Sequence, residues 1–183
     1  MPRLTPSQTI GPFFGVLTRH DRFATAVSGL PGERIVVAGQ VRDGDGAAVP
    51  DALVEIWQAD PAGRWPHPDA DGGAAGGFTG FTRAPTDGGG RYRVETIRPG
   101  GAPGSDERTQ APHLLVGLFA RGLLRRLVTR IYFGDDPALG DDPILALVPA
   151  SRRGTLIAAR RDAGRYEHDL VLQGAGETVF FDV

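Results

Sequence analysis

Cysteine and lysine are both missing from this sequence, and the absence of cysteine excludes several kinds of site. Without cysteine there is no disulfide bond, no thiolate metal ligand and no cysteine nucleophile. The 20 basic residues are all arginine, and 22 acidic residues bring the formal net charge to −2. Because the charges nearly balance, the chain has no overall field that favours nucleic acid or an anionic membrane.

Long hydrophobic runs are missing as well. The longest apolar stretches have the length of a β-strand, which is too short to cross a bilayer as a helix. The first six residues are not followed by the apolar core of a signal peptide. The sequence therefore predicts a soluble, cytoplasmic protein that contacts neither membrane nor nucleic acid.

Turn-forming residues separate many short β-branched runs. There are 27 glycines and 15 prolines, and hydrophobic residues make up 40% of the 183 positions, which is enough for one compact core. Strands are predicted at residues 34–41, 52–58, 91–97, 113–119, 126–133, 155–159, 166–172 and 178–181. No long amphipathic helix is present to connect parallel strands. The pattern predicts an all-β fold, a single-domain β-sandwich of about eight mainly antiparallel strands.

The remaining segments are predicted to form an arm and long loops. Residues 1–33 show no sustained period, so we expect an extended N-terminal arm that is either frayed or bound to another chain. The sandwich domain is expected to occupy residues 34–183. Long loops are expected at residues 60–85 and 99–112, and a short helical turn at residues 144–148.

Motifs for unaided catalysis are not evident. The histidines lie far apart, and no nucleophile elbow, phosphate-binding glycine loop or zinc motif occurs. His168 lies in the middle of a predicted strand, where a structural role is the favoured interpretation. The acidic pairs at 135–136 and 141–142 could bind a hard cation, but flanking prolines favour solvated loop carboxylates.

A set of short motifs occurs in order along the whole chain. They lie at residues 5–13, 39–44, 54–60, 96–100, 111–113, 119–122, 129–133 and 173–182. Together they resemble the intradiol ring-cleaving dioxygenases, and the last resembles the iron-free α chain of two-chain members. The resemblance implies that the chain takes part in cleaving 3,4-dihydroxybenzoate with O₂ to 3-carboxy-cis,cis-muconate in aromatic catabolism.

Most metal ligands of the family are replaced in this chain. The family's catalytic chains hold Fe(III) with two tyrosines and a His-X-His pair, and phenolates suit ferric iron because they are hard anionic donors. Trp65 stands at the first tyrosine, residues 99–104 lack the second, and Leu115 replaces the second histidine after His113. The resemblance thus implies no metal here, with Fe(III) held by a partner β chain. We expect His113 to make a buried hydrogen bond rather than a metal bond.

The resemblance also implies which residues face the partner's pocket. Thr9, Gly11 and Phe13 of the arm would bind substrate as part of the pocket wall. Arg130 would act in catalysis, because a fixed guanidinium favours an anionic substrate and its developing negative charge. The partner would be the β chain of αβ protomers in a larger hetero-oligomer. From the residues alone, an interface or surface salt bridge is the favoured interpretation of Arg130.

Two other functions remain open. One is a stand-alone β-sandwich binding module that uses the dioxygenase scaffold without an enzyme partner. The other is a homo-oligomeric catechol dioxygenase with displaced ligands. For that role the chain offers only Tyr92, Tyr132 and Tyr166, all in predicted strands.

Overall fold

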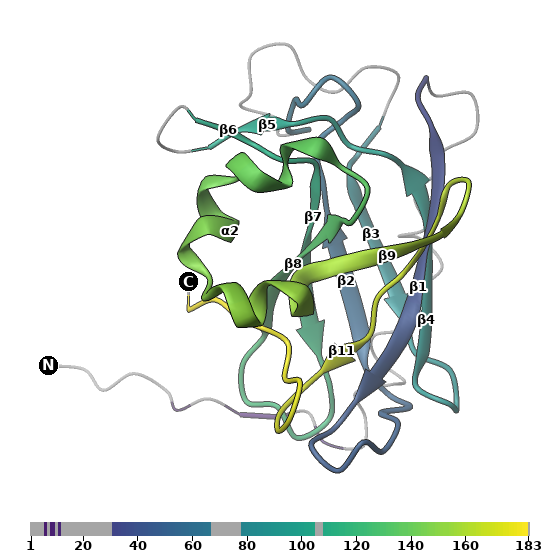
Figure 1. Ribbon diagram of the computed structural model, residues 1–183. Helices are drawn as coiled ribbons and strands as arrows, with labels where there is room; N and C mark the ends of the chain where they lie inside the picture. Colours follow the sequence, from purple (N-terminus) through teal and green to yellow (C-terminus); the bar gives the residue numbers. More distant parts are fainter. Residues whose placement is uncertain are drawn as a thin grey trace, which may run out of the picture.

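The computed structural model describes residues 6, 8, 9, 11, 31–66, 78–104 and 108–182. Within these residues the regular structure consists mainly of strands, and a helical segment lies between the strands at residues 127–133 and 157–162 (Figure 1). The strands are β1 (Arg34–Arg42), β2 (Leu53–Trp57), β3 (Phe81–Pro85), β4 (Arg91–Ile97), β5 (Ala102–Pro103), β6 (Thr109–Gln110), β7 (His113–Phe119), β8 (Leu127–Phe133), β9 (Ile157–Asp162), β10 (Arg165–Glu167) and β11 (Leu170–Val171). The helical segment comprises η4 (Pro137–Asp141), α2 (Pro143–Leu147) and η5 (Ala150–Leu156).

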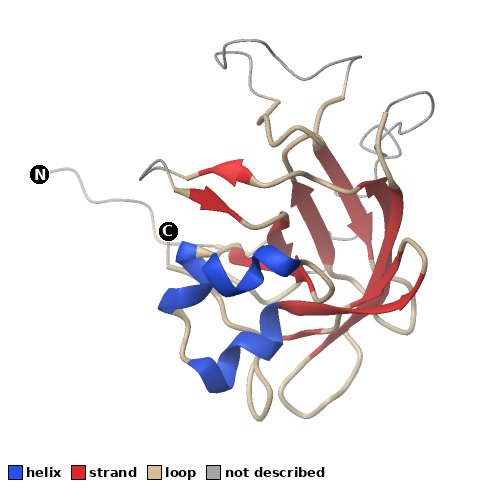
Figure 2. Ribbon diagram, turned by 45° about the horizontal axis from the view of Figure 1, so that its top comes forward, coloured by secondary structure: helices blue, strands red, loops and turns tan. Residues whose placement is uncertain are grey.

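One curled sheet contains most of these strands. Eight of its nine strands follow the order β11-β1-β10-β9-β8-β7-β2-β3, and the ninth, β4, pairs antiparallel with β1. The sheet curls until β3 and β4 approach each other, so the fold is a nearly closed, barrel-like sandwich (Figures 1 and 2). Only β1 with β10, β1 with β11, and β8 with β9 run parallel among the described strand pairs. The predicted all-β, mainly antiparallel fold is confirmed.

Alternating side chains build the core between the curled faces. Along β4, Tyr92, Val94 and Thr96 are buried and the residues between them are exposed, as their sequence alternation predicts. On β7 and β8, Leu114 and Ile131 are paired and fully buried. Burial of each such aliphatic side chain contributes about 1.5–3 kcal/mol to folding, so this central pairing fixes the register of both strands.

A helical segment covers one side of the sheet (Figure 2). Asp142 is the N-cap of α2, where its Oδ1 accepts from the amides of Ile144 and Leu145, and Pro143 occupies the first turn. Asp136 caps η4 in the same way through the amide of Ala138. The predicted helical turn near 144–148 is confirmed, but residues 137–141 form a 3₁₀ turn rather than open loop. No helix in the described part of the chain has the length and apolarity needed to cross a bilayer.

Four strand predictions differ from the structure. Residues 166–172, expected to form one strand, form β10 and β11 with a break between them, and residues 155–156, expected to begin a strand, end η5. Residues 81–85, expected to lie in a loop, form β3, which pairs only with β2. An edge strand needs hydrogen bonds on one side only, so it tolerates Pro85 and a short, polar sequence. Residues 178–181, expected to form a strand, make only one bridge, between Val128 and Phe181. The expected arm of residues 1–33 lies almost wholly outside the described residues.

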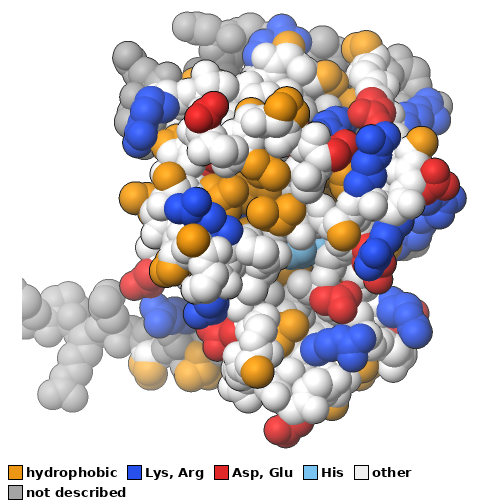
Figure 3. All heavy atoms as spheres, viewed as in Figure 1, with side chains coloured by type: hydrophobic (Ala, Val, Ile, Leu, Met, Phe, Trp, Pro, Cys, Tyr) orange, Lys and Arg blue, Asp and Glu red, His pale blue; other side chains and the backbone are white. Residues whose placement is uncertain are grey.

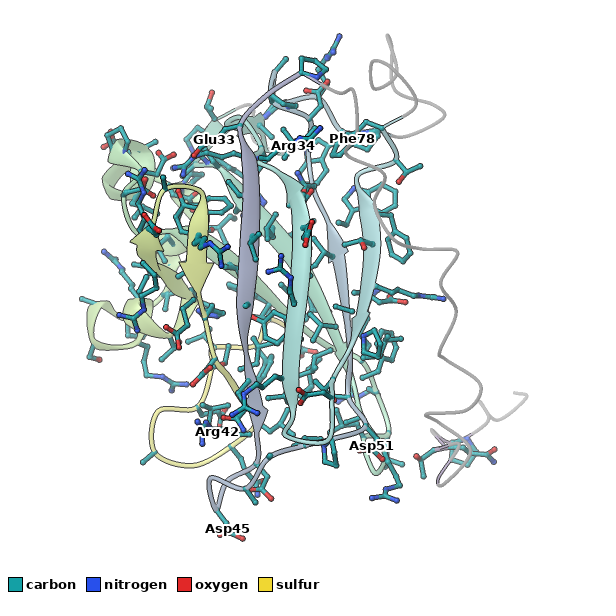
Figure 4. All side chains as sticks on the ribbon, turned by 90° about the vertical axis from the view of Figure 1, so that its right-hand side faces the viewer. Glu33, Arg34, Arg42, Asp45, Asp51 and Phe78 are labelled. Carbon is teal, nitrogen blue, oxygen red and sulfur yellow. The ribbon has the colours of Figure 1, made fainter. Side chains whose placement is uncertain are left out.

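β1 passes very close to the backbone that precedes β11. Figure 4 shows β1 running from Arg34 to Arg42 beside β4. A Cβ added to Gly39 would lie 1.7 Å from the carbonyl oxygen of His168. That carbonyl also accepts a 2.7 Å hydrogen bond from the Tyr92 hydroxyl. His168 is 5% exposed, and its amide donates to the Ala38 carbonyl, so this position links β1 to β4, which supports the structural role predicted for it.

We therefore expect Gly39→Ala to destabilise the fold by about 3 kcal/mol or more, because the new methyl group overlaps backbone that cannot rotate away. The matched control is Gly154→Ala, where an added Cβ meets nothing within 4 Å. Urea unfolding followed by circular dichroism measures both changes. Equal unfolding free energies for the two variants would contradict the close approach of β1.

Candidate functional site

His113 lies at the start of β7 in a closed, mostly aromatic environment. The residue is 2% exposed, and its Nδ1 lies 2.7 Å from the carbonyl oxygen of Ala111. Its ring centroid is 5.9 Å from the ring of Trp65 and 5.6 Å from that of Tyr132. Nε2 has no hydrogen-bond partner among the described residues. The buried hydrogen bond expected for His113 is therefore present.

Burial determines the charge of His113. Loss of solvent, followed by repulsion from the Arg130 guanidinium, lowers the pKa of His113 to about 4. The ring is therefore neutral at pH 7. The contact with the Ala111 carbonyl fixes the tautomer, with the proton on Nδ1 and the lone pair on Nε2.

Of the positions that the resemblance assigns to metal ligands, only His113 carries a metal-binding side chain. Trp65 contacts His113 through its indole ring. The loops carrying the two tyrosine positions pack tightly, since a Cβ on Gly63 would lie 2.0 Å from the carbonyl oxygen of Gly101. Leu115 lies two residues after His113 on the same strand. Within the described residues no group of three or more His, Asp or Glu side chains is arranged to hold a metal ion.

None of the three tyrosines is a plausible phenolate ligand. The hydroxyls of Tyr92, Tyr132 and Tyr166 bond to the His168 carbonyl, to Asp142 and to Asp135, at separate places in the fold. Burial raises the pKa of all three hydroxyls. Because the three hydroxyls are engaged at separate places, they cannot act together as ligands of one ion, which argues against a catechol dioxygenase with displaced ligands.

Arg130 projects from β8 and is held by two neutral acceptors. Its Nη1 donates to Gln110 Oε1 at 2.7 Å and to the hydroxyl of Tyr132 at 3.3 Å. Among the described residues it forms no ion pair. The Tyr132 hydroxyl donates in turn to Asp142 Oδ1 at 2.9 Å. Arg130 thus keeps its charge without a carboxylate against it.

Arg130 lies on the outward face of the β7–β8 hairpin beside an apolar hollow. The hollow measures about 420 Å³, and its lining includes Leu115, Val128, Leu147 and Phe181. Leu147 is 78% exposed, which is unusual for a large aliphatic side chain. Figure 3 shows hydrophobic side chains gathered in the middle of the face that carries the helical segment. One cation beside apolar walls suits a ligand that is both aromatic and anionic.

Thr9 of the arm lies against the loop that joins β7 and β8. Thr9 Oγ1 accepts from the amide of Gly122 at 3.4 Å and from that of Gly11 at 3.3 Å. Thr9 lines a second hollow, of about 200 Å³, which has Phe119 and Arg126 in its wall. Neither Thr9 nor Gly11 lines the hollow of Arg130. The third predicted arm residue, Phe13, lies outside the described residues.

The structure corrects the interpretation of the acidic pairs. Asp142 is 1% exposed and therefore is not a solvated loop carboxylate. Asp135 and Asp136 pair with Arg98, whose guanidinium also lies 4.7 Å from the ring centroid of Phe133. These carboxylates anchor the helical segment to the end of β4, so no cation is needed to explain them.

Comparison with known proteins identifies the family. Residues 10–174 match Dioxygenase_C, a family described as Dioxygenase. The chain is 44% identical to the protocatechuate 3,4-dioxygenase alpha chain of Burkholderia cepacia, covering 98% of this chain and 97% of that one. The chain belongs to the intradiol ring-cleaving dioxygenases. It is also 39% identical to the alpha chain from Pseudomonas putida, covering 97% and 96%, and 41% identical to the beta chain from Burkholderia cepacia, covering 87% and 73%.

Solved structures of intradiol dioxygenases share the fold. A dioxygenase domain from Streptomyces sp. SirexAA-E gives a TM-score of 0.64 at 28% identity, covering 93% of this chain and 98% of that one. Catechol 1,2-dioxygenase from Acinetobacter sp. ADP1 gives a TM-score of 0.65 at 26% identity, covering 87% and 59%. Intradiol dioxygenases use Fe(III). The donor set around His113 does not fit that ion, because one neutral imidazole cannot hold ferric iron specifically.

Sequence reasoning did not identify Gln110, Tyr132 and Asp142 as parts of the site. Each is an ordinary strand or loop residue until the fold brings it beside Arg130. A weak signal existed in Asp142-Pro143, since Asp before Pro is typical of a helix N-terminus. Its contact with the amide of Ala111, 31 positions away, has no local signature.

The neutral state of His113 has a measurable consequence. Its pKa is about 4 in the folded chain and about 6.5 when unfolded, so the unfolded state binds the proton more readily as the pH falls below 6.5. His113 should cost the fold about 2 kcal/mol between pH 7 and pH 5. In His113→Gln this loss should be absent, while His168 contributes equally to both proteins. Urea unfolding at both pH values tests this, and identical pH dependence in the two proteins would refute a buried neutral His113.

Proposed function

We propose that this chain is the non-iron-binding α subunit of a protocatechuate 3,4-dioxygenase. Its partner is the protocatechuate 3,4-dioxygenase beta chain, which holds Fe(III), and together they cleave 3,4-dihydroxybenzoate with O₂. The proposal rests on the surroundings of His113. The chain has the fold of the family, but aromatic rings pack around this histidine, and the described residues supply no set of metal ligands. Similarity to alpha chains over nearly the whole length supports it.

The α chain contributes a cation to the partner's pocket. Arg130 has no direct ion pair with a described carboxylate, and it lies beside apolar walls that lower the local dielectric. A guanidinium in such a setting attracts an aromatic carboxylate more strongly than it would in water. The arm residues Thr9, Gly11 and Phe13 are proposed to border the partner's pocket as well, although Thr9 and Gly11 do not line the hollow of Arg130 within this chain. No chemical step takes place on this chain.

The outward face of β2, β3, β7 and β8 is the surface on which the β chain docks. Trp57 and Phe81 lie on this face around a further hollow of about 310 Å³. The two most exposed large hydrophobic side chains in the described residues, Leu124 and Leu147, line its other hollows. Apolar patches of this kind mark protein interfaces. Docking there would enclose Arg130 against the partner.

The isolated chain should contain no stoichiometric iron and consume no O₂ with 3,4-dihydroxybenzoate, because it lacks the donors for Fe(III). Metal analysis and an oxygen electrode measure both properties. The co-expressed αβ pair serves as the positive control. Stoichiometric iron and a catecholate colour in the isolated chain would refute the proposal, and a chain that elutes alone from a sizing column after co-expression would favour the stand-alone binding module.

Replacing Arg130 with Ala in the co-expressed pair should raise the KM for 3,4-dihydroxybenzoate roughly 10- to 100-fold, as expected for loss of a charged hydrogen bond. The matched control is Arg161→Ala on β9, whose side chain is 63% exposed and pairs only with exposed Glu167. It removes the same charge from a pair that contributes little. Unchanged turnover and KM in the Arg130 variant would assign this residue to the scaffold.

A further inference from the structure

We infer that Gln110 and Tyr132 are positioning residues, which clamp one nitrogen of Arg130 and leave the Nε–Nη2 edge of its guanidinium free to bind the substrate carboxylate. The inference rests on the proposed pocket role of Arg130. Beyond that role, the inference specifies which edge of the Arg130 guanidinium binds the substrate and which residues of this chain hold that edge in place.

The clamp occupies one nitrogen completely. Nη1 has two hydrogens and two acceptors, Gln110 Oε1 at 2.7 Å and the Tyr132 hydroxyl at 3.3 Å. Nε and Nη2 have no partner among the residues that the structure describes. These two nitrogens form the side edge of the planar fork, which matches the two oxygens of a carboxylate. Arg130 therefore offers one bidentate edge to a ligand.

Asp142 orients both acceptors. Its Oδ1 accepts a 2.9 Å hydrogen bond from the Tyr132 hydroxyl, so the hydroxyl presents a lone pair toward Arg130. Its Oδ2 accepts from the amide of Ala111 at 2.8 Å, which fixes the backbone next to Gln110. Two further amides, at the start of α2, complete the coordination of Oδ1. The buried carboxylate thus joins β6, β8 and α2 around the guanidinium.

Both acceptors are themselves immobile. Gln110 is 8% exposed and lies in the β5–β6 ribbon, opposite Ala102. Tyr132 is fully buried, and its ring packs against His113. A free arginine side chain samples many rotamers. A ligand that has to order it loses binding free energy to the conformational entropy of that side chain. A guanidinium ordered in advance avoids that loss.

The test uses the co-expressed αβ pair and two variants that each remove one acceptor. Gln110→Leu deletes the amide, and Tyr132→Phe deletes only the hydroxyl and keeps the ring. Each should raise the KM for 3,4-dihydroxybenzoate about 10-fold with kcat nearly unchanged, because binding rather than chemistry is weakened. Affinity for catechol, which lacks the carboxylate and is measured by competition, should not change. Thr96→Val, which removes a different buried hydroxyl, is the control and should behave as the unmodified enzyme.

A double-mutant cycle separates positioning from general stability. In an Arg130→Ala background, Gln110→Leu and Tyr132→Phe should add no further rise in KM, because they act only through Arg130. An unchanged KM in both single variants, or an equal rise that persists without Arg130, overturns the inference while the pocket role stands. If Arg130→Ala alone leaves the KM unchanged, the pocket role fails, and the positioning role fails with it.

Discussion

Ferric iron in this family requires several hard anionic donors at one point, and the fold of this chain still brings the corresponding positions together. What meets there is a neutral imidazole between two aromatic rings, with an indole in place of a phenol. The lone pair of His113 Nε2 has no described partner, and burial keeps the ring uncharged. Packed aromatic rings therefore occupy these positions, which supports the proposal that another chain holds the iron.

The replacement of the second histidine by Leu115 also changes the outward face of the β7–β8 hairpin. Leu115 makes the strand apolar at the point where the family has its second histidine, and Arg130 is its cross-strand neighbour. An isolated arginine beside an apolar wall would be costly if it were fully buried within one molecule. The proposed interface would surround it with a partner and an anionic ligand. The buried carboxylate of Asp142 links this face to the helical segment, so the site and the fold share one polar network.

Much of the fold could be predicted from the sequence, because the strands that matter most alternate clearly. The predicted bounds of β4 and β7 coincide with the observed ones, and β1, β2 and β8 differ by a residue or two. β3 was missed because an edge strand needs only one hydrogen-bonded neighbour and little hydrophobicity. Residues 178–181 look like a strand in isolation, but they make only one bridge, to Val128.

The candidate site could be predicted only in part. The sequence alone shows that His113 matches the family pattern and that Trp65 and Leu115 depart from it. The network around Arg130 depends on contacts between segments 20 and 31 positions apart, which leave no local pattern. Asp142 was interpreted as solvated because its burial is a property of the tertiary fold alone.

The most direct test of the account is a crystal structure of the αβ complex with iron located by anomalous scattering. The account predicts iron density coordinated only by side chains of the partner subunit, with the free edge of Arg130 facing the same cavity. Iron density beside His113, coordinated by side chains of this chain, would contradict it.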